Sequence, residues 1–202
     1  MSLLVGNSTQ LGPEGALVAT SIQSITRIQW NQQAPLTHAM RAINDLHWSM
    51  QDADWTASLG LIQINPDTGY GSICTAGKIQ AFIVSPRGFR PIGSQVCEVG
   101  AQPDTEFILS RFVVQPGEIL VTYTSDIVNE RSFAPPSQKM RGRRSLPYSS
   151  LDQNSLLQIV RDMIDQRASD ISGYLARTLP TFDRDAVDGR DRSLILIKNT
   201  RK

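Results

Sequence analysis

Residues 115–126 read QPGEILVTYTSD, a turn sequence that runs directly into an apolar segment and ends in an acid. Pro116 presets one backbone φ of a turn, and Gly117 supplies the positive φ that other residues resist. Residues 119–124 then have the composition of a β-strand. Because the apolar residues 107–114 stand before the turn, the pattern predicts a β-hairpin.

Two more stretches carry the same signature. Residues 56–64 and 70–74 flank the turn Asn65-Pro66-Asp67-Thr68-Gly69, and residues 80–84 and the stretch from Phe89 flank Ser85-Pro86-Arg87-Gly88. Repeated hairpins predict antiparallel sheet through the middle of the chain. The apolar runs Leu3–Val5 and 193–197 add a strand near each end, and we expect the last one to be covered on both faces.

Helices are predicted on either side of this region. Apolar residues recur at three- and four-residue steps from Pro13 to about Trp30 and again over 35–50, where Thr37 is placed to cap the helix. The same periodicity extends over 151–179, with Gly173 as a point of interruption. Residues 131–150 are rich in Pro, Ser and Arg without periodicity, which predicts an irregular insertion.

The composition describes one domain, residues 1–202, because 202 residues with 40% hydrophobic content bury one good-sized core. The 20 Lys and Arg balance the 19 Asp and Glu, and a net charge of +1 gives no case for a nucleic-acid partner or for binding a membrane surface. No signal-peptide pattern and no run of about 18 apolar residues occurs, so we expect a cytoplasmic protein.

Several segments, in this order along nearly the whole chain, resemble the metal-dependent protein phosphatases (PPM, or protein phosphatase 2C-like), in their branch of bacterial sporulation and stress-response phosphatases. Residues 115–126 are similar to the family's Pro-Gly-Asp strand, which ends in Thr-Asp-Gly. The other matching segments are Val5-Gly6-Asn7 with Gly15-Ala16-Leu17, Pro35 with Asn44, Thr56–Leu59 with Asn65–Gly69, Thr75-Ala76-Gly77-Lys78, Pro91-Ile92-Gly93, and Arg190-Asp191-Arg192-Ser193-Leu194.

The resemblance implies an α+β fold, a four-layer α-β-β-α sandwich of two antiparallel sheets flanked by helices. Active relatives hold two Mg²⁺ or Mn²⁺ ions at one end of the sandwich, where a metal-bound hydroxide attacks a phosphoserine or phosphothreonine. The family also has a Gly-Asp ligand motif on a strand before the one that opens this chain, and no residue before Leu3 carries it. Either that segment is missing from the sequence or the protein never had these first strands.

The same resemblance implies a degenerate metal site. Asp126 fits the family's Asp-Gly ligand, but Ile127 replaces the glycine. Asn7 replaces the acid of the first loop, Arg190 replaces the last ligand acid, and Asp191 matches a second acidic position that is not ordinarily a direct ligand. Because two dications need several carboxylates, we expect weak metal binding at most and no resident cofactor. Asp126 is either a surviving ligand or a turn residue, and Arg190 is either a substitute cation or a surface residue.

Other candidate residues have structural explanations. His38 and His47 lie on one predicted helix at a spacing that does not aim both at one ligand. The basic residues within 139–144 fit a phosphate or an acidic partner, but a solvated loop explains them better.

Three functions stay open. We favour a non-catalytic PPM-like module, a pseudophosphatase that binds a regulatory protein partner or a phosphoprotein in a bacterial signalling system. The alternative is an active phosphoserine/phosphothreonine phosphatase that uses Mn²⁺ or Mg²⁺ and takes its missing ligand from a preceding segment; the third is a structural domain of a larger sensor. A missing segment would explain the absent Gly-Asp motif but not Asn7, Ile127 or Arg190, which favours the first.

Overall fold

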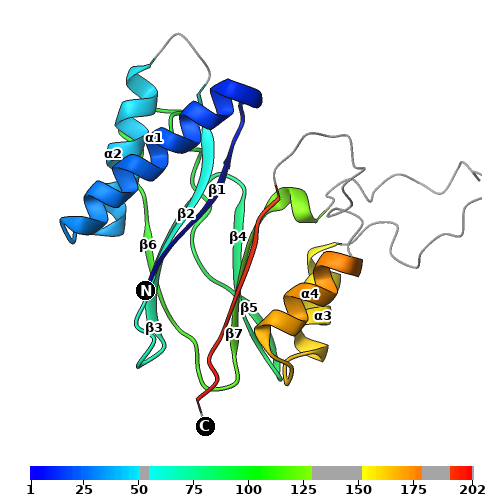
Figure 1. Ribbon diagram of the computed structural model, residues 1–202. Helices are drawn as coiled ribbons and strands as arrows, with labels where there is room; N and C mark the ends of the chain where they lie inside the picture. The colour runs from blue at the N-terminus through cyan, green and yellow to red at the C-terminus, as the bar shows by residue number, and fades with distance from the viewer. Residues whose placement is uncertain (51–54, 129–151, 179–191, 202) are drawn as a thin grey trace, which may run out of the picture.

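The computed structural model describes residues 1–50, 55–128, 152–178 and 192–201. Their strands form two antiparallel sheets that stack face to face (Figure 1). Sheet A has the order β1-β2-β3-β6, with β1 Ser2–Ser8, β2 Ala57–Ile64, β3 Tyr70–Ala76 and β6 Leu109–Val113. Sheet B has the order β5-β4-β7-β8, with β5 Gly88–Pro91, β4 Ile79–Ser85, β7 Ile119–Thr124 and β8 Leu194–Lys198.

Helices cover the outer face of each sheet (Figure 1). Helices α1 (Gly12–Asn31) and α2 (Leu36–Ser49) pack on sheet A, while α3 (Gln153–Asp162) and α4 (Ala168–Thr178) pack on sheet B. A short 3₁₀ helix, η1 (Ser125–Ile127), follows β7. The four-layer sandwich expected from the sequence is therefore confirmed.

Among the described residues, three apolar clusters fill the spaces between the layers. One joins sheet A to α1 and α2, and another joins sheet B to α3 and α4. Between the sheets, the buried residues are Ile62, Ile64, Ile73, Ala81, Ile83, Phe112, Val114 and Leu120. The almost continuous burial of β2 and β7 follows from this arrangement, because both strands lie inside a sheet that is covered on its two faces.

Two of the three predicted hairpins are confirmed, and the third is wrong. β2 pairs with β3 across Asn65–Gly69, and β4 pairs with β5 across Pro86–Arg87. In contrast, β6 pairs with β3 in sheet A while β7 pairs with β4 and β8 in sheet B. The turn at residues 115–118 therefore carries the chain from one sheet to the other. Just before this turn, Val114 O accepts a hydrogen bond from Asn199 Nδ2 at 2.8 Å, and Val114 N donates to Gly69 O at 3.0 Å.

The helical predictions need smaller corrections. Thr37 lies inside α2 and the N-cap is Pro35, so the predicted threonine cap is wrong. The helical stretch after residue 151 breaks between Asp162 and Ala168 rather than at Gly173. β8 has apolar packing on both faces, as expected, because Leu194 and Leu196 contact the cluster under α3 and α4 and Ile197 contacts the cluster between the sheets. The strand is only half-buried, since β7 is its one neighbour among the described strands.

The predicted insertion over 131–150 lies outside the described residues. In the described part of the chain, no helix combines the length and the apolar character needed to cross a membrane.

Candidate functional site

The ends of β1 and β7 bring together two side chains that are far apart in sequence. Asn7, near the end of β1, donates a hydrogen bond from Nδ2 to Oδ2 of Asp126 at 3.2 Å. Asp126 follows β7 in the short helix η1. Both side chains are half-buried. The contact therefore joins the edge strand of sheet A to the loop that leaves sheet B.

An arginine approaches the same loop from the start of β8. Arg192 donates from Nε to the main-chain oxygen of Asp126 at 3.0 Å. Its position is fixed by the next residue, since Ser193 and Thr124 exchange two hydrogen bonds, from Thr124 N to Ser193 O and from Ser193 N to Thr124 Oγ1, each 3.1 Å long. An amide and a guanidinium thus face the Asp126 segment.

Ile127, the residue that follows Asp126, is a core residue. Its side chain is fully buried in the cluster between sheet B and helices α3 and α4. Val128 N donates to Ser125 O at 3.0 Å and closes the turn around Asp126. The branched side chain therefore anchors the loop through packing, a function that a glycine could not perform.

A second polar cluster lies beside Asn7 on the neighbouring strand. Ser58, which pairs with Asn7 in the β1–β2 ladder, donates from Oγ to Glu98 Oε1 at 3.0 Å. Thr56 donates to the other oxygen of Glu98 at 2.9 Å, and Lys78 N donates to Ser58 Oγ at 3.0 Å. The Glu98 carboxylate is thereby held by two hydroxyl groups.

Glycine at position 77 makes this cluster possible. Gly77 has φ +69°, and a Cβ there would lie 2.5 Å from Ser58 Oγ and 2.7 Å from Glu98 Cγ. Only a residue without a side chain fits both the space and the left-handed conformation. The turn between β3 and β4 is therefore shaped around the Glu98 carboxylate.

Helix α2 holds the segment that carries Glu98. Asn44 is fully buried; its Oδ1 accepts a hydrogen bond from Gly100 N at 2.9 Å and its Nδ2 donates to Gln102 O at 3.0 Å. Val99 and Ala57 exchange two backbone hydrogen bonds beside it. One buried amide on the helix thus fixes the loop against β2.

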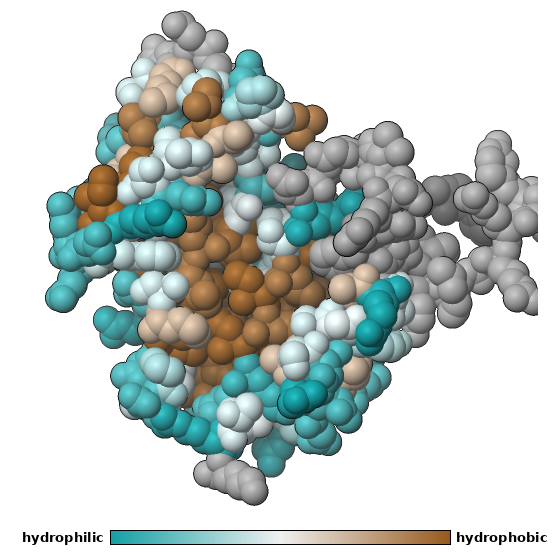
Figure 2. Space-filling view, viewed as in Figure 1, coloured by the Kyte–Doolittle hydropathy of each residue, from teal (hydrophilic) through white to brown (hydrophobic). Residues whose placement is uncertain are grey.

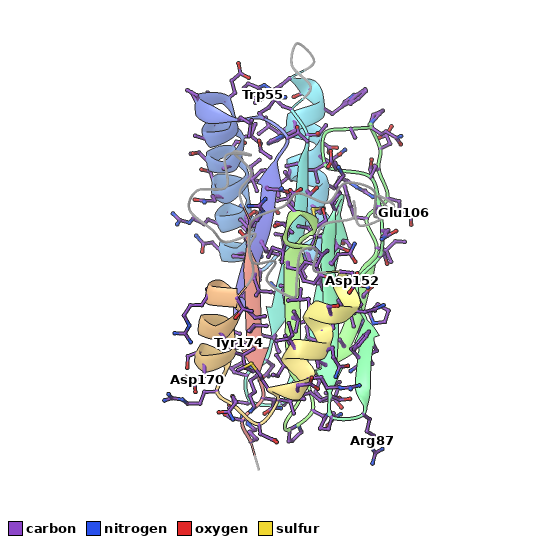
Figure 3. All side chains as sticks on the ribbon, turned by 90° about the vertical axis from the view of Figure 1, so that its right-hand side faces the viewer. Trp55, Arg87, Glu106, Asp152, Asp170 and Tyr174 are labelled. Atoms are coloured by element: carbon purple, nitrogen blue, oxygen red, sulfur yellow. The ribbon has the colours of Figure 1, made fainter. Side chains whose placement is uncertain are left out.

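The site lies toward the end of the sandwich near Trp55, away from the β4–β5 turn that carries Arg87 (Figure 3). Of the residues singled out from the sequence, the structure brings Asn7 and Asp126 together and places Ile127 in the core. Arg190 and Asp191 lie outside the described residues. Sequence reasoning missed the contact of Arg192, although it quoted the segment, and it missed Glu98, which stands in no recognisable motif.

The described residues do not fit a pair of divalent ions. No group of three His, Cys, Asp or Glu side chains among them could hold a metal ion. Asp126 faces the amide nitrogen of Asn7, and Glu98 is engaged by Thr56 and Ser58. Two dications need more carboxylate oxygens than this arrangement presents, so we derive no reaction step through a metal.

Comparison with protein families identifies the chain. The family model described as stage II sporulation protein E (SpoIIE) matches residues 1–178. The chain belongs to the SpoIIE family. Among curated proteins, none matches this SpoIIE-family chain by sequence.

Solved structures share the fold of this SpoIIE-family chain at low sequence identity. The RsbU and RsbW domains of a Mycobacterium tuberculosis protein align with a TM-score of 0.65 at 19% identity, over 96% of this chain and 50% of theirs. The PP2C domain of SiaA from Pseudomonas aeruginosa gives a TM-score of 0.67 at 13% identity, over 96% of this chain and 74% of its own.

A Bacillus subtilis structure, the PP2C phosphatase domain of SpoIIE with a fragment of its regulatory domain, gives a TM-score of 0.60 at 13% identity, over 96% of this chain and 53% of that one. The SpoIIE-family chain therefore spans about half the length of two of these three chains. At these identities the likeness establishes the PP2C-like fold and leaves activity to be argued from the site.

Proposed function

We propose that this chain is a non-catalytic, pseudophosphatase module that acts by binding a regulatory protein or a phosphoprotein in a bacterial signalling system. The observation that carries the proposal is the contact of 3.2 Å between Asn7 Nδ2 and Asp126 Oδ2. In this contact an amide hydrogen meets the carboxylate that the resemblance assigns to a metal ion. The chain thus stabilises the loop by hydrogen bonding where active relatives use coordination.

Arg192 adds a second argument. Its guanidinium lies at the Asp126 main-chain oxygen, and Arg cannot be deprotonated in proteins. A fixed cation beside the loop opposes the binding of a second cation there, by simple repulsion. The same cation, together with the amide of Asn7, favours an anionic group on a partner.

The nature of the partner is suggested by the solved relatives. One of them combines RsbU and RsbW domains in a single structure, and another is described as a modular stressosome system that controls secondary messenger signalling. A protein partner of this regulatory kind is what we propose for this chain.

The proposal is tested with an aryl phosphate substrate and Mn²⁺. We expect hydrolysis in excess Mn²⁺ to stay at background, and titration calorimetry to show no pair of micromolar sites. Asp126→Ala is the control for any residual rate, because it removes the remaining carboxylate of the contact. Turnover that depends on both Mn²⁺ and Asp126 would overturn the proposal.

An active phosphatase is the second candidate, and the carboxylate of Asp126 at the end of β7 favours it. In that case a preceding segment of the natural protein would supply the missing Gly-Asp ligand. The decisive comparison is the same assay on the natural protein with any sequence that precedes Met1. Activity there, lost in Asp126→Ala, would establish the enzyme.

We also propose that the guanidinium of Arg190 takes the place of a metal ion beside Asp126. Asp191, in this proposal, does not bind metal. Arg190→Asp should then lower the melting temperature without metal, and Mn²⁺ should recover part of the loss by binding the folded form. Thermal melts of the wild type and of Arg190→Asp, each with and without Mn²⁺, test this role of Arg190. Identical melting in all samples would make Arg190 a surface residue.

A further inference from the structure

The loop that carries Asp126 lies at a hydrophilic part of the surface. Figure 2 shows hydrophilic residues where η1 meets the start of β8, above an apolar surface between α1 and α4. Ile127, the next residue, is fixed by packing in the core, whereas the half-buried Asp126 side chain accepts a hydrogen bond from Asn7. The direction of the Asp126 carboxylate therefore depends on the polar contacts that reach this loop.

Three hydrogen bonds form a relay from Glu98 to the start of η1. Ser58 Oγ donates to Glu98 Oε1 at 3.0 Å, and Lys78 N donates to Ser58 Oγ at 3.0 Å. Ser125, the first residue of η1, then donates from its N–H to Lys78 O at 3.0 Å. The two backbone groups of Lys78 thus connect the Ser58 hydroxyl group with the helix that carries Asp126.

The candidate site closes this relay into a ring. Asn7, which donates to Asp126, is also the partner of Ser58 in the β1–β2 ladder. Five residues from the two sheets and η1 make up the ring: Ser58, Lys78, Ser125, Asp126 and Asn7. Glu98 lies outside the ring and contacts it through Ser58.

The direction of these hydrogen bonds requires an acceptor at position 98. Ser58 is buried, and its oxygen already accepts from Lys78 N, so its single proton needs a separate acceptor. Glu98 Oε1 provides it, while Glu98 Oε2 accepts from Thr56 at 2.9 Å. An ionised carboxylate can accept both hydrogen bonds at once, and such charge-assisted bonds are stronger than neutral ones. Glu98 therefore fixes the orientation of the Ser58 hydroxyl group.

We propose that Glu98 is a positioning residue for Asp126. The Glu98 carboxylate acts through Ser58 and the Lys78 backbone. These groups hold Ser125, and with it the short helix on which Asp126 lies. The proposal does not rest on the non-catalytic function proposed above, because the same positioning would serve a metal ligand or a hydrogen-bond acceptor. It is tested without substrate and without metal, so its failure and the failure of the proposed function are separate results.

Hydrogen exchange of single backbone amides, followed by NMR, tests the relay. Glu98→Ala removes the acceptor, and we expect exchange at Lys78 and Ser125 to become at least about tenfold faster. The amide of Thr124, which donates to Ser193 O outside the relay, is the reference and should change less. A loss of global stability alone would not single out the relay amides. Unchanged exchange at Ser125, or the same acceleration at Thr124, would overturn the proposal.

Two variants of similar size are the matched controls. Glu98→Gln keeps a side-chain oxygen that can accept from Ser58, so it should recover most of the protection at Ser125. Thr56→Val removes the hydroxyl group on the other oxygen of Glu98 and leaves the relay intact, so exchange at Ser125 should stay near the wild-type rate. Exchange at Ser125 that is as fast in either control as in Glu98→Ala would contradict the proposal.

The side-chain amide signal of Asn7 reports the position of Asp126, because Asn7 Nδ2 donates to its carboxylate. In Glu98→Ala this NMR signal should move toward the position that it takes in Asp126→Ala, where the acceptor is absent. An Asn7 signal that keeps its wild-type position would overturn the proposal. If Glu98→Ala does not fold by circular dichroism, Ser58→Ala removes the next atom of the relay and should accelerate exchange at Ser125. Unchanged exchange in that variant would equally overturn it.

Discussion

At the scale of single residues, we expect the contact of Asn7 with Asp126 to control whether Mn²⁺ binding affects the stability of the fold. Asn7→Asp places two carboxylates where an amide now donates at 3.2 Å. Losing this hydrogen bond and adding repulsion should cost about 1–2 kcal/mol of unfolding free energy without metal. Mn²⁺ should recover part of this loss.

Thermal melts with and without Mn²⁺ measure the effect of this substitution. The matched control is Asn7→Ala, which removes the hydrogen bond but adds no charge and should show no recovery with Mn²⁺. The same Mn²⁺-induced shift in both variants would mean that position 7 does not face the metal.

We expect the free energy of unfolding to depend on pH through His47. Burial lowers the pKa of His47, against the opposing effect of its hydrogen bond to the Trp55 carbonyl. A group with a lowered pKa in the folded state stabilises the fold above its unfolded pKa of 6.5, because the unfolded chain binds the proton more readily. This contribution is lost as the pH falls from there through the folded pKa.

Urea unfolding between pH 7.5 and about 5 checks the slope that this linkage predicts. His47→Gln should flatten the decline at low pH. His38→Gln is the matched control, because His38 is exposed on the same helix. If both variants decline as steeply as the wild type, then His47 is not the source of the pH dependence.

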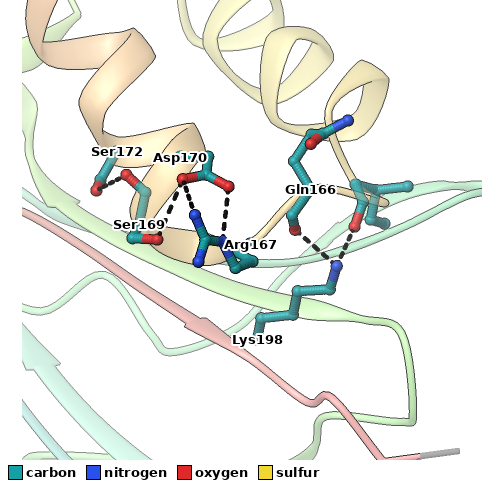
Figure 4. A network of polar contacts seen from close by, with 7 residues as sticks. Gln166, Arg167, Ser169, Asp170, Ser172 and Lys198 are labelled. Atoms are coloured by element: carbon teal, nitrogen blue, oxygen red, sulfur yellow. Dashed lines mark hydrogen bonds and ion pairs between the residues drawn. The ribbon is translucent and has the colours of Figure 1, made fainter.

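At the scale of elements, one lysine ties β8 to the connection between α3 and α4. Lys198 donates from Nζ to Ile164 O at 2.6 Å and to Gln166 O at 2.7 Å (Figure 4). These carbonyls lie just after the end of α3, where backbone acceptors lack helical partners. The lysine therefore stabilises the break between the two helices.

We expect Lys198→Met to lower the unfolding free energy by about 2 kcal/mol, since two charge-assisted hydrogen bonds are lost while the apolar stem is kept. Arg201→Met is the control; Arg201 pairs with the exposed Asp67 at 3.0 Å, and such surface pairs contribute about 0–1 kcal/mol. Chemical denaturation of both variants measures the difference. Equal losses would show that the Lys198 contacts are no stronger than a surface ion pair.

At the scale of the whole molecule, we expect the apolar layer between the sheets to make sheets A and B unfold together. Leu120 on β7 is fully buried in this layer, so Leu120→Ala should cost about 3 kcal/mol. The three tryptophans, at positions 30, 48 and 55, all lie on the side of sheet A, across the layer from Leu120. Tryptophan fluorescence and circular dichroism should nevertheless shift together. A fluorescence transition that stays at the wild-type position would mean that the sheets unfold separately.

A feature of the fold or of the site could be predicted from the sequence when neighbouring residues determine it, and not when it depends on contacts between distant residues. The turns at residues 65–69 and 85–88 specify hairpins through their own Pro and Gly, so β2–β3 and β4–β5 were predictable. The turn at 115–118 has similar residues but joins two sheets, because strand partners are chosen by long-range packing that a turn does not encode. The family resemblance located Asn7 and Asp126, whereas Glu98 depends on Asn44 and Gly77, which are distant in sequence.

The position of β8 in the chain has a consequence for synthesis on the ribosome. β7 ends at Thr124, and its outer neighbour begins at Leu194, 70 positions later. Sheet A, by contrast, has all four of its described strands once residue 113 has been made. Protein synthesis adds about 5–20 residues per second, so β8 is made several seconds after β7. During that interval β7 is an open apolar edge in the nascent chain, and chaperone capture or misfolding should concentrate there.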